Sequence, residues 1–260
     1  MNAVLKAWLN IPAPVRAGVR WGVRACGLSE PVLRRLGGWP MPDDFRPASF
    51  HTPPAVEASI ARIAAEGLAG DYYEFGLWRG YTFCQAQKKA QECGLTQMRF
   101  WGFDSFAGLP EAEAAANESE YPKEAMGALE KGDFSCSRSQ VEAYLAQYGV
   151  DRSRTELIEG FYDQTLTAGL AASKGMAPVA VALVDCDLYV STVPVLKFLG
   201  PLLQDGSIIL FDDWNIFGES NEVGERKAFA EFLEANSGWR AEPYVTFGWH
   251  GQGFVMRRNP

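Results

Sequence analysis

Two stretches of this 260-residue chain decide its fold: VAVALVDCD at residues 179–187 and SIILFDDW at residues 207–214. Each begins as an uninterrupted apolar run and contains aspartates directly after it. Continuous apolar runs, unlike alternating ones, are typical of strands that helices cover on both faces. We therefore predict two adjacent central strands of a parallel sheet, with carboxylates where the strands end.

Short apolar runs alternate with helical patterns from residue 71 onward. This alternation predicts an α/β fold with a doubly wound, mostly parallel sheet. The last two runs flank GWHG at residues 248–251 and predict an antiparallel hairpin that completes a seven-stranded sheet. Strands are expected at residues 72–75, 98–103, 155–158, 179–184, 207–211, 242–247 and 253–257, and helices at residues 55–68, 81–92, 139–148, 193–203 and 223–235.

The first fifty residues differ from the rest in composition. Residues 1–40 carry six basic side chains and one acidic one, whereas the whole chain has a formal charge of −8. Residues 37–54 contain five prolines and two glycines, which predicts a linker. We expect an N-terminal helical extension and linker over residues 1–50 and a main domain over residues 51–260. The basic extension would dock on its own chain, on a second copy in a homo-oligomer, or on a membrane surface.

The composition also excludes several classes of protein. The net negative charge argues against a nucleic-acid partner, since phosphate binding needs a positive surface. The sequence has no apolar run long enough to span a membrane, and its first residues do not resemble a secretory signal. We therefore expect a cytoplasmic protein that acts on a small molecule or a glycan. Its cysteines form no CxxC pair and suit structural thiols in a reducing compartment: Cys26, Cys84, Cys93, Cys136 and Cys186.

Two polar motifs follow the first two predicted strands. In EFGLWRG, Gly76 and Gly80 would let the backbone pass close to a ligand at a helix N-terminus. Asp104 ends WGFD, where an acid can accept hydrogen bonds from the ribose of an adenosine-type cofactor. Position 78 is Trp, so the G-x-G-x-x-G motif of nicotinamide enzymes is absent. The motifs predict a nucleoside site, with a tight turn and a helix cap as the structural alternatives.

Four aspartates follow the two strands predicted at residues 179–184 and 207–211. They would repel one another unless a cation lay between them. Carboxylate oxygens are the ligands that hard cations such as Mg²⁺ prefer, and Mg²⁺ keeps several waters, so two or three protein ligands suffice. We predict a metal site at Asp185, Asp212 and Asp213, with Asp187 behind the ligands or capping the next helix. Helix capping by all four is the structural alternative.

A long segment at residues 106–137 interrupts the alternation of strands and helices. It has no clear period and is rich in Ala, Glu and Gly. Loops of that length inside a compact domain are usually lids or binding elements. We expect a lid over the site, and the alternative is a solvated surface excursion.

The segments EFGLWRG, FWGFDSFAGLP, EGFYDQTL, DCDLYVST and LFDDW resemble, in order and spacing, those of the macrocin-O-methyltransferase-like family of sugar O-methyltransferases. The resemblance spans about residues 50–258. It implies a class I, Rossmann-like methyltransferase fold and Mg²⁺-assisted methyl transfer from S-adenosylmethionine to a hydroxyl group, on a sugar of a glycosylated natural product or a surface glycan. The sequence departs from the family at Cys186, at Phe161-Tyr162 and in the lid. The difference in the lid concerns the identity of the substrate and not the reaction.

The resemblance also gives roles to residues at the strand ends. The methionine end of the cofactor would lie at the loop after the first strand, the ribose at Asp104, and the adenine at the loop after the third strand. The metal triad matches Asp185, Asp212 and Asp213. The cofactor-binding positions are Glu74, Gly76, Gly80, Asp104, Ser105, Phe106, Gly160, Phe161, Asp163 and Asp185.

A sugar hydroxyl needs a group that accepts its proton once a metal has lowered its pKa. The candidates are Asp185 and a histidine. The chain has His51, at the entry of the main domain, and His250, in the predicted hairpin turn. We single out Asp185 and His51 as catalytic candidates, with a structural or surface role as the alternative for each histidine.

Two other functions stay open at this point. Asp185-Cys186-Asp187 is a DxD sequence, which metal-dependent glycosyltransferases use to hold a nucleotide diphosphate. That interpretation leaves EFGLWRG and the pair Asp212-Asp213 without a role. The chain could also be a non-catalytic binding protein on the same fold, although it retains all three predicted metal carboxylates.

Overall fold

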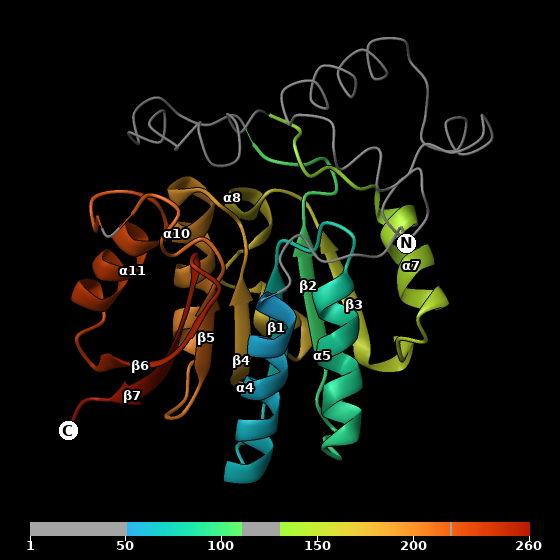
Figure 1. Cartoon of the computed structure of the whole chain (residues 1–260), viewed down its shortest axis with the longest axis horizontal. Coiled ribbons are helices and arrows are strands. Elements are labelled where there is room, and N and C mark those ends of the chain that lie inside the picture. The colour runs from blue at the N-terminus through green and yellow to red at the C-terminus, as the bar shows by residue number, and fades with distance from the viewer. Residues whose placement is uncertain (1–50, 111–130, 219) are drawn as a thin grey trace. The chain divides into compact units, whose positions relative to one another are not determined.

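The computed structural model describes residues 51–110, 131–218 and 220–260. Within these ranges the strands form one seven-stranded sheet in the order β3-β2-β1-β4-β5-β7-β6. The first five strands pair in parallel, whereas β7 pairs antiparallel with both β5 and β6. The predicted doubly wound, mostly parallel sheet with a terminal antiparallel hairpin is confirmed (Figure 1). The expectations for residues 1–50 lie outside the described residues.

Every predicted strand and helix is present, and the observed ends differ from the predicted ones by at most three residues except in one helix. Helix α10 begins at Tyr189 rather than residue 193, with Pro194 inside the helix, and two short helices, α8 and α9, have no counterpart in the sequence pattern. None of the helices in the described ranges has the length and apolar character of a membrane span. The strands are β1 (Asp71–Phe75), β2 (Phe100–Asp104), β3 (Thr155–Glu159), β4 (Val179–Val184), β5 (Ile208–Phe211), β6 (Trp239–Phe247) and β7 (Gly251–Arg258). The helices are α4 (Thr52–Glu66), α5 (Tyr81–Glu92), α7 (Arg138–Gln147), α8 (Tyr162–Thr165), α9 (Leu170–Lys174), α10 (Tyr189–Leu199) and α11 (Gly224–Ala235), with the 3-10 turns η3 (Arg152–Arg154) and η4 (Gly200–Leu202).

Helices cover both faces of the sheet, which explains why its central strands are apolar throughout (Figure 1). Side chains of β1 alternate between the two faces. Tyr72 packs edge-on against Phe83 of α5, and Phe75 packs edge-on against Phe198 of α10. All six residues of β4 are fully buried, as a central strand between two helical layers requires.

The strand order reverses between β1 and β4, so the carboxyl ends of these two strands form the crevice in which such sheets bind ligands. Gly76 lies directly after β1 at this point. Its N–H donates to the Phe103 carbonyl, and the Asp185 N–H donates to the Phe75 carbonyl, both at 2.9 Å. A Cβ atom at Gly76 would lie 1.7 Å from the Asp185 carbonyl oxygen, and φ is +91°. Gly76 therefore lets the two loops approach each other, besides bordering the crevice.

Gly76→Ala should lower the free energy of unfolding by about 3 kcal/mol or more, because the new methyl group would overlap backbone and adopt a strained φ. Gly94→Ala is the matched control: φ is +73°, but nothing lies within 4 Å of its Cβ position. That variant should lose about 1 kcal/mol from the backbone conformation alone. Urea unfolding measures both, and equal losses would show that the contact with Asp185 is unimportant.

Candidate active site

A cavity of about 510 Å³ lies at the carboxyl ends of the parallel strands, next to the switch point between β1 and β4. This volume falls in the range of small-molecule sites. Loops after all five parallel strands contribute to its wall. The lining residues that the sequence singled out are Gly76, Trp78, Asp104, Ser105, Gly160, Phe161, Asp163, Asp185, Asp187, Asp212 and Asp213.

Three of the ten predicted cofactor residues do not line this cavity. Glu74 is buried within β1, where its Oε2 accepts a 2.5 Å hydrogen bond from the Tyr72 hydroxyl. Gly80 is the N-cap of α5, and a Cβ atom there would lie 3.0 Å from Leu145 of α7. Phe106 has its ring buried. These residues support the walls of the cavity, and a direct contact with cofactor stays a prediction for each.

Asp104 connects the loops that follow β1 and β2. Its Oδ2 accepts hydrogen bonds from the Leu77 N–H at 2.8 Å and the Trp78 N–H at 3.1 Å, and its Oδ1 accepts from the Phe106 N–H at 2.6 Å. Burial raises the pKa of Asp104, and these three hydrogen bonds oppose the rise. Each carboxylate oxygen has two lone pairs, so the same group can hold the loops and still accept a ribose hydroxyl.

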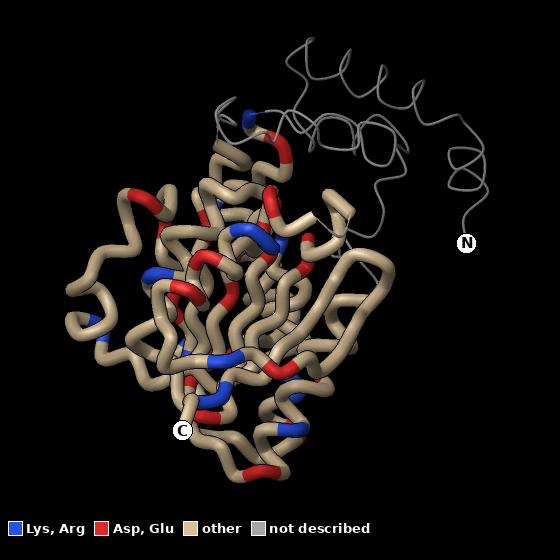
Figure 2. The backbone as a smooth tube through the Cα atoms, turned by 90° about the vertical axis from the view of Figure 1, so that its left-hand side faces the viewer, with Lys and Arg blue, Asp and Glu red and all other residues tan. Residues whose placement is uncertain are grey.

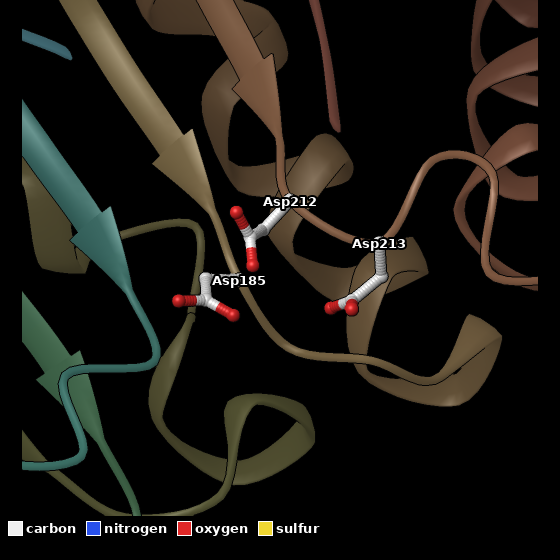
Figure 3. Close-up of side chains that lie close together, drawn as sticks. All are labelled: Asp185, Asp212 and Asp213. Atoms are coloured by element: carbon white, nitrogen blue, oxygen red, sulfur yellow. The ribbon is translucent and has the colours of Figure 1, made fainter. Parts of the chain in front are cut away.

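Three carboxylates converge beside the crevice. Asp185 follows β4, Asp212 and Asp213 follow β5, and one oxygen from each lies within 4.8 Å of the other two. Figure 3 shows the three side chains just beyond the ends of β4 and β5, with Asp185 and Asp212 facing each other and Asp213 farther along the loop after β5. Adjacent residues of a strand point to opposite faces, but β5 ends at Phe211, and this end allows both Asp212 and Asp213 to reach the same space. The structure thus brings together the whole predicted metal set.

Groups distant in sequence hold the triad in place. The Thr52 hydroxyl donates to Asp212 Oδ1 at 2.5 Å, and His250 Nδ1 lies 2.7 Å from the Asp212 carbonyl oxygen. The Asp187 N–H donates to Asp213 Oδ2 at 3.0 Å. Sequence reasoning missed Thr52, which lies three residues before the predicted first helix of the main domain and begins the observed helix α4. A threonine at a helix start is a common cap and carries no signal of its contact with a residue 160 positions away.

The charges of the site favour a cation. Burial is the main cause of the raised pKa of Asp185, Asp212 and Asp213. Repulsion from neighbouring carboxylates adds to the rise at Asp185 and Asp213, while the Thr52 hydrogen bond lowers the pKa of Asp212. Elsewhere acidic and basic residues are interspersed along the chain (Figure 2). Three convergent carboxylate oxygens with room for waters in the adjoining cavity fit a hard divalent cation such as Mg²⁺.

The structure separates the two catalytic candidates. Asp185 lines the cavity, whereas His51 is exposed at the N-terminus of α4 and is not part of the wall. The His51 ring lies 6.3 Å from the ring of His250. The neighbour of His51, Thr52, contacts the triad instead. A catalytic role for His51 stays a prediction, and this geometry favours Asp185.

The two described ends of the predicted lid meet beside the cavity. The Leu109 N–H donates to the Asp133 carbonyl, and the Gly132 N–H donates to the Leu109 carbonyl, both at 3.0 Å. Leu109 and Phe134 line the cavity, and the ring of Phe134 packs edge-on against Trp78. Residues 111–130 of the expected lid lie outside the described residues. The described part therefore contributes a mostly apolar wall to the site, which also includes Lys131.

Comparison with known proteins identifies the family. The family model described as macrocin-O-methyltransferase (TylF) matches residues 54–237. This chain belongs to the macrocin-O-methyltransferase family. It is 31% identical over 161 residues to a tetracenomycin rhamnosyl 4'-O-methyltransferase of Streptomyces olivaceus and 26% identical over 165 residues to mycinamicin III 3''-O-methyltransferase of Micromonospora griseorubida. These matches cover 62% of this chain and 59% and 61% of the two relatives.

Two solved structures show the same fold. The O-methyltransferase NovP matches with a TM-score of 0.65 at 19% identity, over 79% of each chain. CalS11, a calicheamicin methyltransferase, matches with a TM-score of 0.63 at 20% identity, over 97% of this chain and 89% of its own. At this identity the likeness concerns the fold. The family and the class I methyltransferase fold expected from the sequence are both confirmed.

Without metal, the protein should lose stability as the pH rises from about 5 to 8. Burial raises the pKa of Glu74 to about 8, and the pKa of Asp185 and Asp213 is also raised. These carboxyl groups keep their protons in the folded state at a pH where the unfolded chain releases them, so the free energy of unfolding falls across that window. Calorimetry in EDTA and in Mg²⁺ should show a larger metal-induced rise in Tm at about pH 8 than at about pH 6.

Glu74→Gln is the informative variant, because it removes one of these groups and its repulsion of Asp185 while all three triad carboxylates stay in place. In EDTA, the free energy of unfolding of this variant should fall less between about pH 5 and 8 than that of wild type. Mg²⁺ should still raise its Tm. A metal-induced rise in Tm that is identical at both pH values would contradict the linkage between these carboxyl groups and a cation.

Proposed function

We propose that this chain transfers a methyl group from S-adenosylmethionine to a sugar hydroxyl, assisted by Mg²⁺ or another hard divalent cation. The observation that carries the proposal is the convergence of Asp185, Asp212 and Asp213 at one wall of the cavity. Membership of the macrocin-O-methyltransferase family supports the reaction. The names of the two relatives support the acceptor, since one of them refers to a rhamnosyl group.

The cofactor would lie along the strand ends. The methionine end would occupy the crevice beside Gly76 and Asp185, and the ribose hydroxyls would bond to Asp104. The adenine would lie against the loop after β3, where Phe161 and Asp163 line the cavity. Gly160 fixes the start of this loop, because its N–H donates to the Asp104 carbonyl at 3.0 Å. This arrangement would put the sulfonium methyl group near the triad.

The reaction mainly requires alignment, because a sulfonium methyl group is already an activated electrophile. A cation held by Asp185, Asp212 and Asp213 would lower the pKa of the acceptor hydroxyl. Thr52 and His250 would hold Asp212 in the orientation that the triad needs. Of the two catalytic candidates, Asp185 lies within reach of both the crevice and the triad, so we propose it as the proton acceptor.

By analogy with the relatives, we propose that the acceptor is a sugar of a glycosylated natural product. A surface glycan is the alternative. The DxD interpretation has less support, because Asp185 joins the triad with Asp212 and Asp213 and not with Asp187. We also propose a cytoplasmic location, because the sequence has an odd number of scattered cysteines without a CxxC pair. Assembly into a homo-oligomer stays a prediction.

Asp212→Asn and Asp213→Asn should each lower methyl transfer at least about a hundredfold, because each removes one charged metal ligand. S-adenosylhomocysteine should still bind within a few-fold of the wild-type affinity, since neither residue lies at the proposed nucleoside positions. The assays are methyl transfer to a panel of glycosides that includes rhamnosides, with and without chelator, and calorimetry of S-adenosylhomocysteine.

Asp205→Asn is the control, since Asp205 is an exposed acid that precedes β5 at the opposite end of the sheet. It should retain wild-type transfer. Wild-type transfer by Asp212→Asn in the presence of chelator would refute a metal mechanism. Binding of a nucleotide-sugar but not of S-adenosylhomocysteine would favour a glycosyltransferase instead.

A further inference from the structure

The first turn of α11 holds the loop that carries two of the triad residues. The Asp213 N–H donates to Glu225 Oε2 at 3.0 Å. The next residue, Arg226, donates from Nε to the Trp214 carbonyl at 3.0 Å and from Nη2 to Asn215 Oδ1 at 2.6 Å. Two consecutive side chains of the helix thus bond three consecutive residues after β5. This pattern makes the orientation of the loop depend on α11.

Glu225 is an unusual member of this pair because it is almost completely buried, with 1% of its surface exposed. One oxygen accepts the Asp213 N–H, and the other, Oε1, has no hydrogen-bond partner among the described residues. A buried unpaired polar atom costs about 1–3 kcal/mol, so packing and stability do not explain a glutamate here. A role at the adjacent site does.

Glu225 connects α11 to both loops of the triad. Its partner Asp213 accepts the Asp187 N–H at Oδ2, at 3.0 Å. The hydrogen bonds therefore run from α11 to the loop after β5 and on to the loop after β4. Glu225 itself is not part of the cavity wall, so it would influence a bound cation through Asp213 or through its charge, not as a ligand.

We propose that Glu225 is a positioning residue for the metal site, which directs the Asp213 carboxylate by accepting the Asp213 N–H. The inference rests on the proposed function, in which Asp213 is a metal ligand. A hydrogen bond to the backbone N–H restricts the position of the Asp213 Cα atom, from which the side chain extends. Without an acceptor at this place, the buried N–H would be left unpaired, and the loop would rotate to find another partner. The feature that matters is the reach of the side chain, not its charge.

Two variants of Glu225 separate reach from charge. Glu225→Gln keeps an acceptor oxygen at the same distance from the backbone and removes the charge. Glu225→Asp keeps the charge but is shorter by one carbon–carbon bond, about 1.5 Å. Glu225→Gln should bind Mn²⁺ within about threefold of wild type, whereas Glu225→Asp should bind it about 10–100-fold more weakly, as when other residues that orient metal ligands are replaced.

Titration of the full chain with Mn²⁺, followed by electron paramagnetic resonance, measures these affinities. The spectrum of bound Mn²⁺ should be the same in Glu225→Gln as in wild type and altered in Glu225→Asp. Glu234→Gln is the control, because Glu234 is exposed on the same helix and its replacement removes the same charge. Calorimetry of S-adenosylhomocysteine and thermal unfolding in EDTA show that each variant is folded.

The outcomes separate this inference from the function on which it rests. Equal loss of Mn²⁺ affinity in both variants, or loss in Glu225→Gln alone, would overturn the positioning role and assign the effect to charge. Wild-type affinity in Glu225→Asp would also overturn it. A wild-type chain that binds S-adenosylhomocysteine but no Mn²⁺ would instead contradict the metal part of the proposed function.

Discussion

Repulsion among carboxylates at the ends of β4 and β5 is the constraint on which the rest of the site depends. Asp185, Asp212 and Asp213 approach within 4.8 Å, and burial raises the pKa of each. A folded chain can tolerate this arrangement only by keeping protons or by binding a cation. The surrounding hydrogen bonds run from Thr52 to Asp212 and from Asp213 to Glu225. They hold the carboxylates in place although the carboxylates repel one another.

The sheet topology explains why a metal site and a cofactor site can adjoin. The strand order reverses between β1 and β4, so a crevice forms at the carboxyl ends of these strands. Asp185 follows one strand of the crevice and belongs to the triad, whereas Asp104 follows the strand on the other side of β1. A ligand that spans the crevice would therefore have one end at the ribose position and the other at the metal. Alignment of methyl donor and acceptor would follow from the order of the strands.

The sequence predicted the fold because its strongest signals were local. The run VAVALV predicts β4 with its observed bounds, Val179–Val184, since an uninterrupted apolar run is typical of a strand buried on both faces. Helices α8 and α9 were missed because four or five residues are too few to show a helical period. The start of α10 was placed too late, near Pro194, although the helix includes this proline.

The triad was predictable and its supports were not. Parallel strands bring their carboxyl ends to one edge, so aspartates after adjacent strands must lie close together. No such rule predicts the contacts of Thr52 and Glu225, because these depend on how α4 and α11 pack on the sheet. Gly76 was expected to allow a ligand to approach, and the structure adds a second reason, the proximity of the Asp185 carbonyl. Local patterns therefore identify the reacting groups, and only the packing identifies what orients them.

Anomalous diffraction from crystals grown with Mn²⁺ and S-adenosylhomocysteine tests the central claim most directly. We predict one Mn²⁺ peak in contact with an oxygen of each of Asp185, Asp212 and Asp213, at about 2.0–2.3 Å. We also predict the cofactor product along the adjoining cavity, with its ribose at Asp104. A structure in which S-adenosylhomocysteine is bound but no peak lies among the three aspartates would contradict the account.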